Sequence, residues 1–114
     1  MKYLCLVYLD ENKLDAVPDR ECKACGESLR QSGHHIAAEA LQSVHTATTV
    51  RVRNGNVSVT DGPFAETKEQ LLGFVLIEAK DHDDAVEVAS RIPLARLGSV
   101  EVRSIMDLAR IGQS

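Results

Sequence analysis

The chain has 114 residues and a mass of 12.4 kDa, the size of one domain with a single hydrophobic core. Hydrophobic residues make up 44% and charged residues 26%, which is typical of a globular protein and excludes a disordered one. The net charge of −4 and the aromatic content of 4% argue against nucleic acid as a partner, because that would require a basic face or stacking aromatics.

The cysteines and the N-terminal segment bear on the location of the protein. Three cysteines, Cys5, Cys22 and Cys25, cannot form a closed set of disulfides, so reduced thiols are the simplest interpretation. The apolar run at residues 3–9 is seven residues long, too short to span a membrane, and no small-residue cleavage site follows it. We therefore expect a cytoplasmic protein without membrane attachment.

The first half of the chain predicts a strand, a helix and a weaker strand. Residues 3–9 form a continuous apolar run that is typical of a strand buried on both faces. Residues 19–32 are predicted as a helix that follows Pro18 and ends before Gly33, with Cys22, Cys25 and Leu29 on its apolar face. Residues 34–41 alternate weakly and indicate a second strand.

The clearest local signal is a β-hairpin over residues 50–60. Its turn is Asn54-Gly55, because a type I′ turn requires positive φ at both central positions. The predicted register pairs Val50 with Val59 and Val52 with Val57, and it places Arg51 and Arg53 on the opposite face.

The segment after the hairpin, Asp61-Gly62-Pro63-Phe64, should end the strand because Pro63 has no N–H to donate. We expect Thr67 to Gln70 to form one helical turn with a capping box. Residues 71–79 then form a second apolar run, again predicted as a buried strand.

The last two elements are a helix and a strand. Asp81, Asp83 and Asp84 place negative charge at the positive end of a helix that Pro93 should stop. Residues 100–106 alternate, so valines should face the helices and the charged side chains Glu101 and Arg103 should face away.

This order of elements predicts an α+β fold in which two helices cover one face of a mainly antiparallel sheet. Two helices leave the other face open, yet the runs at 3–9 and 71–79 are apolar on both faces. Another copy of the chain is the simplest cover for that face, so we expect a homodimer packed through its sheets.

The segment Val59-Thr60-Asp61-Gly62-Pro63-Phe64-Ala65-Glu66-Thr67-Lys68-Glu69-Gln70-Leu71 resembles the DGPF branch of the YCII-related family. The resemblance extends to Met1-Lys2-Tyr3-Leu4, to residues 47–51 and to residues 97–103. It implies one domain over residues 1–114, with a ferredoxin-like fold that carries an inserted β-hairpin. It also implies a dimeric α/β barrel in which two sheets enclose a cleft.

The resemblance implies less about chemistry. In the other branch of the family, a His on the first helix and an Asp before a Pro late in the second are thought to act as a pair. Here the first helix has no His and the residue before Pro93 is Ile92, so that pair does not carry over. Some members of the DGPF branch resemble domains associated with extracytoplasmic sigma factors.

The loop at residues 61–69 supplies the first candidate site. Asp61 or Glu66 could act as a general base, and Lys68 and Glu69 could bind a small anionic substrate. The alternative is purely architectural, with Asp61 capping the turn and the other charges solvated.

A second set comprises Glu39, Glu101 and Arg103, which the strand alternation places in the interface or cleft. They either meet a ligand or form a structural Glu–Arg pair across the dimer. Arg51 could recognise a carboxylate with two parallel hydrogen bonds, or it could be part of a solvated hairpin face.

We expect neither a metal nor a cofactor. Cys22-x-x-Cys25 resembles half of a metal site but has no second pair, and core packing explains it better. Among the histidines, His35 and His45 are the ones that could enter a cleft.

Two functional hypotheses remain. The first is a cofactor-free small-molecule enzyme of the isomerase or lyase type, in which Asp61 or Glu66 moves a proton. The second is a non-catalytic dimer that senses a ligand or docks on a partner such as a sigma factor.

Overall fold

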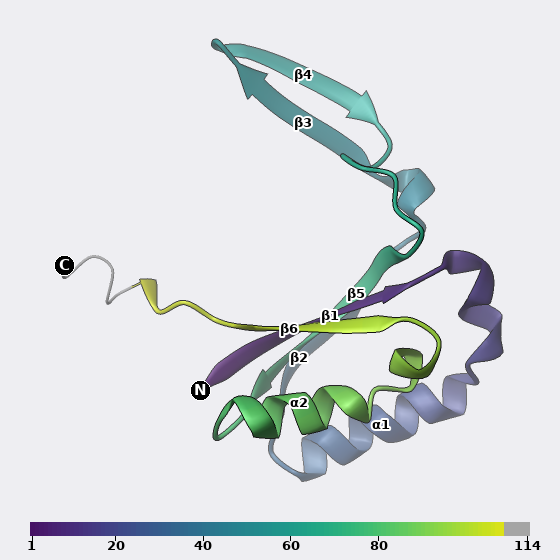
Figure 1. Ribbon diagram of the computed structural model, residues 1–114, viewed down its shortest axis with the longest axis vertical. Coiled ribbons are helices and arrows are strands. Elements are labelled where there is room, and N and C mark those ends of the chain that lie inside the picture. Colours follow the sequence, from purple (N-terminus) through teal and green to yellow (C-terminus); the bar gives the residue numbers. More distant parts are fainter. Residues whose placement is uncertain (109–114) are drawn as a thin grey trace.

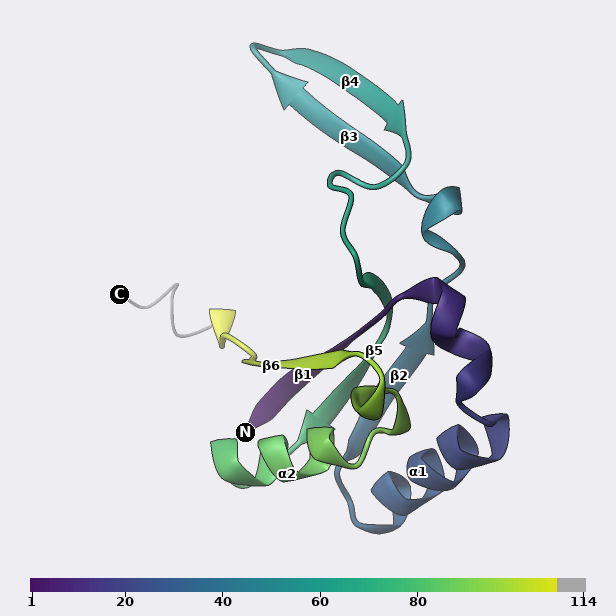
Figure 2. The ribbon, with the colours of Figure 1, turned by 45° about the vertical axis from the view of Figure 1, so that its right-hand side comes forward.

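The computed structural model describes residues 1–108, which form a four-stranded sheet, two helices and a separate hairpin. The sheet contains β1 (Lys2–Leu9), β2 (His35–Ala40), β5 (Gln70–Glu78) and β6 (Ser99–Ser104). Its order is β2-β5-β1-β6, and every neighbouring pair is antiparallel. Both helices, α1 (Asp19–Gln31) and α2 (His82–Ser90), lie on one face of the sheet (Figures 1 and 2). The arrangement confirms an α+β architecture and is compatible with a ferredoxin-like fold.

The core lies between the sheet and the two helices. Alternate residues of β1 point toward the helices, so Tyr3, Cys5 and Val7 are buried. Helix α2 contributes Ala85, Val88 and Ala89 at helical spacing, whereas α1 buries only Leu29. The two helices therefore cover the sheet unequally, and α2 packs more closely than α1.

On the other face of the sheet, which we call the open face, no helix or strand of residues 1–108 is packed (Figures 1 and 2). Leu4 and Leu6 of β1 lie opposite Leu76 and Phe74 of β5 on this face, and all four side chains are only half-buried. The prediction that residues 3–9 are buried on both faces therefore does not hold within one chain.

The hairpin, which we call the arm, consists of β3 (Thr48–Arg53) and β4 (Asn56–Asp61) and projects away from the sheet (Figure 1). Its turn has φ of 53° at Asn54 and 78° at Gly55, which confirms the predicted positive values. The predicted register is also confirmed, with Val50 opposite Val59 and Val52 opposite Val57.

Two local predictions were wrong. Residues 67–70 form no helical turn; Gln70 instead begins β5 opposite Leu9, and its Nε2 donates to the carbonyl of Thr67 at 2.7 Å. Cys22 lines the same side of α1 as Cys25, as predicted, but it is exposed instead of packed in the core. In both cases tertiary contacts outweigh the local sequence pattern.

Three 3₁₀ helices occupy segments for which the sequence indicated no regular structure or only the end of a helix. They are η1 (Glu11–Ala16), η2 (Val44–Thr46) and η3 (Pro93–Arg96). The Asp10 side chain accepts a hydrogen bond from the Asn12 N–H at the start of η1, and Ser43 does the same for His45 at the start of η2. Pro93 begins η3, as its fixed φ allows.

Candidate functional site

A polar cleft of ≈ 610 Å³ lies where β1 ends and where β5 and β6 begin. Its residues come from β1 and η1, from the loop ahead of β5, and from β6. They are Tyr8, Asp10, Lys13, Thr67, Lys68, Glu69, Ser99, Val100 and Glu101. Two of the predicted substrate-binding residues, Lys68 and Glu69, thus lie together with Glu101, although they are far apart in sequence.

Glu69 is a carboxylate of the cleft that a residue of β6 holds in place. It is half-buried, and the Ser99 hydroxyl of β6 donates a hydrogen bond to its Oε1 at 2.7 Å. The next residue, Gln70, accepts a hydrogen bond from the Glu11 N–H at 3.0 Å. These contacts hold the end of the loop against both β6 and η1, so the Glu69 carboxylate has a defined position.

Two lysines supply positive charge to the cleft. Lys13 of η1 and Lys68 of the loop both line it, and within residues 1–108 neither forms an ion pair. The neighbouring Asp10 carboxylate accepts the Asn12 N–H at 3.0 Å. The ammonium groups are therefore free to bind an anion, which is how lysine acts as a point charge.

The other predicted residues of the loop and arm lie outside the cleft. Asp61 ends β4 opposite Thr48, and the following Gly62 donates its N–H to the Ala47 carbonyl at 2.7 Å. Arg51 donates to the Phe64 carbonyl at 3.4 Å, so it contacts the base of the arm. Glu66 is exposed in the loop.

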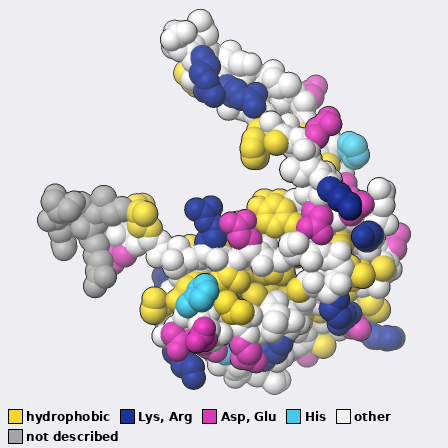
Figure 3. Space-filling view, in the orientation of Figure 1, with side chains coloured by type: hydrophobic (Ala, Val, Ile, Leu, Met, Phe, Trp, Pro, Cys, Tyr) yellow, Lys and Arg dark blue, Asp and Glu magenta, His cyan; other side chains and the backbone are white. Residues whose placement is uncertain are grey.

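Two further predicted residues lie on the open face. Glu39 of β2 is opposite Phe74 of β5, and Arg103 of β6 lies 3.9 Å from Glu101 of the same strand. Both members of the Glu101–Arg103 pair are exposed, so this pair contributes little stability by itself. Figure 3 shows hydrophobic side chains on the side of the sheet turned away from the helices, with charged side chains along their border.

Sequence reasoning missed a hydrogen-bonded chain of Ser32, His34 and Asp84 at the end of α1. The Ser32 hydroxyl lies 2.7 Å from His34 Nδ1, and His34 Nε2 lies 3.1 Å from Asp84 Oδ2. The pKa of the Asp84 carboxyl lies below its ordinary value, mainly because the Lys80 N–H donates to it and secondly because of the contact with His34. The pair is 50 residues apart in sequence, so no local spacing could have indicated it.

Glu11 is a second residue that the sequence did not single out. Its carboxylate accepts the Val44 N–H at 2.7 Å and the Ser43 hydroxyl at 2.9 Å, and these bonds lower its pKa. Glu11 therefore joins η1 to η2, next to the cleft. Its role is to position the segments that carry Lys13 and the arm.

The described residues 1–108 contain no group of three or more His, Cys, Asp or Glu side chains that could hold a metal ion. Within the same residues, no helix is long and apolar enough to cross a membrane. The cleft thus combines two lysines that form no ion pair within residues 1–108 with the carboxylates of Asp10, Glu69 and Glu101, which are groups that can bind ions and transfer protons.

Comparison with known proteins identifies the family of the chain. Residues 1–109 match the YCII-related domain. The chain belongs to the YCII-related family. An uncharacterised protein of Rhizobium meliloti (strain 1021) is 36% identical in an alignment that covers 92% of each chain. The resemblance read from residues 59–71 is thereby confirmed at the level of the YCII-related family, and the function of this member must be argued from its own cleft.

Proposed function

We propose that this YCII-related protein is a cofactor-free cytoplasmic enzyme that moves a proton on a small anionic molecule, in a reaction of the isomerase or lyase type. The observation that carries the proposal is the juxtaposition of Glu69, held by Ser99 at 2.7 Å, with two lysines that have no ion pair within residues 1–108. A positioned carboxylate beside free cationic groups is what abstraction of a proton next to a substrate carboxylate requires.

Each residue has a distinct role. Lys68 and Lys13 bind the anionic group of the substrate, and Glu69 accepts the proton. Tyr8 also lines the cleft, and its phenol is a group that can donate a hydrogen bond to the substrate. Asp61 and Glu66, the predicted catalytic residues, lie outside this cleft in one chain and keep that role only if a second copy brings its own loop to the cleft.

The proposed assembly is a homodimer that forms a dimeric α/β barrel of the DGPF branch. The apolar open face supports it, as do the valines of the arm, whose side chains are 57–67% exposed. Apolar surfaces of this extent are unusual on a monomer, and one isologous contact between two copies would cover both. Closure by a second copy would also remove water from the cleft, which strengthens the electrostatic interactions inside it.

Ligand-dependent thermal unfolding tests the proposal. Wild type, Lys68→Gln, Glu69→Gln and Asp61→Asn are melted with small carboxylates, lactones and phosphate esters. We expect a concentration-dependent rise in melting temperature that Lys68→Gln abolishes and the distant Lys80→Gln preserves, because a ligand of the native state stabilises it by mass action. Turnover of the stabilising compound should be lost in Glu69→Gln.

The result that contradicts the proposal is equally specific. A stabilising compound that acts equally on Lys68→Gln and wild type does not bind in this cleft. If Glu69→Gln retains turnover while Asp61→Asn loses it, the base is Asp61.

The alternative is a non-catalytic dimer that senses a ligand or docks on a partner such as a sigma factor. The arm favours this candidate, because Val57 is 67% exposed and Phe64 at its base is 79% exposed. Val57→Lys should abolish binding to a purified sigma factor and leave the dimer mass unchanged if the arm is a docking surface. Loss of the dimer in Val57→Lys would instead assign the arm to the homodimer contact.

A further inference from the structure

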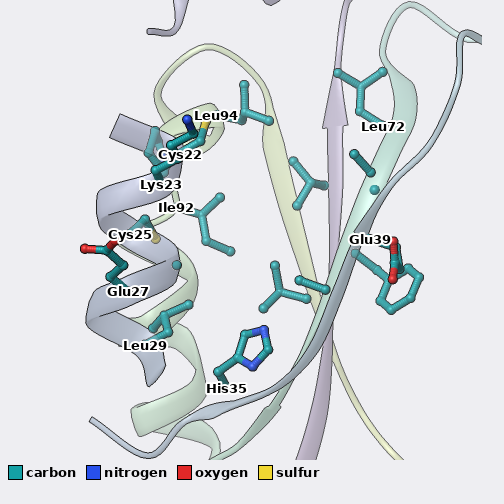
Figure 4. A pocket seen from close by; sticks show the side chains of 18 of the residues that line it. Cys22, Lys23, Cys25, Glu27, Leu29, His35, Glu39, Leu72, Ile92 and Leu94 are labelled. Carbon is teal, nitrogen blue, oxygen red and sulfur yellow. The ribbon is translucent and has the colours of Figure 1, made fainter. Parts of the chain in front are cut away.

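A second pocket, of ≈ 510 Å³, lies between α1 and the helix-facing side of the sheet (Figure 4). The space exists because α1 buries only Leu29 against the core, so most of the helix stands off from β2 and β5. Leu72, Ile92 and Leu94 form its apolar walls. None of its residues belongs to the polar cleft beside the loop.

Small residues on both sides of the pocket keep it open. Cys25 and Gly26 line it from α1, while Ala38 of β2 lines it from the sheet. Gly73 of β5 also lines it, and a Cβ there would come within 2.6 Å of the Glu39 carbonyl oxygen. The close approach of β2 and β5 thus requires glycine at that point, and no side chain from position 73 can fill the volume.

His35 is the polar group inside this pocket. Its imidazole points into the space between α1 and the sheet, while the carboxylates of Glu27 and Glu39 point away from it (Figure 4). His35 is half-buried, and within residues 1–108 its ring has no hydrogen-bond partner. An imidazole in an apolar pocket without a protein partner is available to hydrogen-bond to a ligand.

The rim of the pocket carries cations. Lys23 and Arg30 of α1 both line it, and neither has an ion pair within the described chain. Arg30 lies across Gly26, where a Cβ would be 3.6 Å from its Nη1. The guanidinium therefore lies beside Gly26, on the side of the helix that lines the pocket.

We infer that this pocket binds a small aromatic or branched aliphatic monocarboxylic acid. The apolar body of the ligand packs against Leu29, Leu72 and Ile92, and its carboxylate lies between the His35 imidazole and the Arg30 guanidinium. The volume falls within the range of small-molecule sites, and apolar walls with a few convergent polar groups are their usual composition. Guanidinium and imidazole donors favour a carboxylate over a neutral group of the same shape.

Titration with 2-naphthoate, followed by the His35 imidazole resonances and by backbone amide NMR, tests this site. We expect saturable shifts at His35 in the wild-type protein. Ala38→Leu, which fills the pocket, should weaken binding about tenfold or more. Ala37→Leu is the matched control, because Ala37 lies opposite Leu76 on the open face of the same strand and should leave the affinity within about twofold.

The chemistry of recognition is tested with 2-naphthamide, the neutral analogue. It should bind wild type about fivefold more weakly than 2-naphthoate, and Arg30→Gln should remove that difference. Equal affinities of acid and amide for wild type would overturn the assignment of a carboxylate ligand.

Two outcomes overturn the pocket itself. One is the absence of any shift at His35 up to about 5 mM 2-naphthoate. The other is an equal effect of Ala37→Leu and Ala38→Leu. If Ala38→Leu does not fold, Cys25→Leu fills the same space from α1. Lys68→Gln should not alter these shifts. The Lys68→Gln variant therefore distinguishes failure of this site from failure of the polar cleft.

Discussion

His34 and Asp84 join the end of α1 to the first turn of α2. His34 Nε2 lies 3.1 Å from Asp84 Oδ2, and both side chains are mostly shielded from solvent. The same carboxylate also accepts the Lys80 N–H at 3.1 Å, just ahead of the helix. One side chain therefore both stabilises the start of α2 and ties α2 to α1, the helix that buries least of its surface in the core.

This arrangement predicts the pH dependence of Asp84→Asn. The Lys80 N–H, and after it His34, lower the pKa of Asp84 in the folded state relative to the unfolded state. A lowered pKa stabilises the fold above the unfolded value, and that contribution is lost as pH falls through the folded value. Asp84→Asn should therefore melt below wild type at neutral pH, and the gap should close below about pH 4.

The control for this measurement is Asp83→Asn, in the same first turn of α2. It changes the same charge at the helix N-terminus without removing the contact to His34. A gap between wild type and Asp84→Asn that stays constant down to low pH would show that the carboxyl pKa is not responsible.

Two glycines should respond to alanine with opposite signs. At Gly98 a Cβ would come within 2.1 Å of the Tyr8 carbonyl oxygen, so Gly98→Ala forces backbone apart and should cost about 1–3 kcal/mol of unfolding free energy. Gly26 lies inside α1, where a Cβ would meet only the flexible Arg30 side chain at 3.6 Å. Gly26→Ala should add about 0.5–1 kcal/mol, measured by urea unfolding.

The three thiols should differ in reactivity toward a disulfide reagent at mildly alkaline pH. Burial raises the pKa of the Cys5 thiol to about 11, and Cys5 is fully enclosed in the core, so it should react only after unfolding. Cys22 is exposed and should react first, followed by the half-buried Cys25. Mass spectrometry of the labelled peptides gives the order, and early labelling of Cys5 would contradict the placement of β1 in the core.

The proposed homodimer predicts the effect of a charge on the open face. Leu6 of β1 lies opposite Phe74 at the centre of this face, so Leu6→Arg should convert a dimer to a monomer. Val86→Arg is the control, because Val86 is 45% exposed on α2 and lies outside the proposed contact. Light scattering after gel filtration measures the mass. A wild-type protein that is monomeric at micromolar concentration would refute the dimer.

Local sequence signals succeeded where the physical cause is itself local. The arm follows from Asn54-Gly55, because few other residue pairs accept positive φ at two successive positions. The start of α2 follows from Asp81, whose side chain accepts the Asp84 N–H at 2.8 Å. Val100 and Val102 face the core because successive side chains of a strand point to opposite faces of the sheet.

The turn expected at residues 67–70 shows where local signals fail. Thr67 and Gln70 have the spacing of a capping box. In the structure, however, Gln70 pairs with Leu9 in the sheet, and its side chain accepts a hydrogen bond from the Glu11 N–H. A single turn of helix is marginal on its own, so these tertiary contacts outweigh it.

By itself, the sequence determined the family, the α+β architecture and the hairpin with its register. It also showed the excess of apolar residues on both faces of two strands. Each of these rests on periodicity, on backbone preference or on a distinctive motif. Only the tertiary structure decided which charged residues meet. It brought Lys13, Lys68 and Glu69 into one cleft and His34 to Asp84. It also left His35 without a hydrogen-bond partner among residues 1–108, in a space bounded by small side chains. Such contacts depend on how strands and helices dock, and docking is set by packing over the whole chain, which no local spacing records.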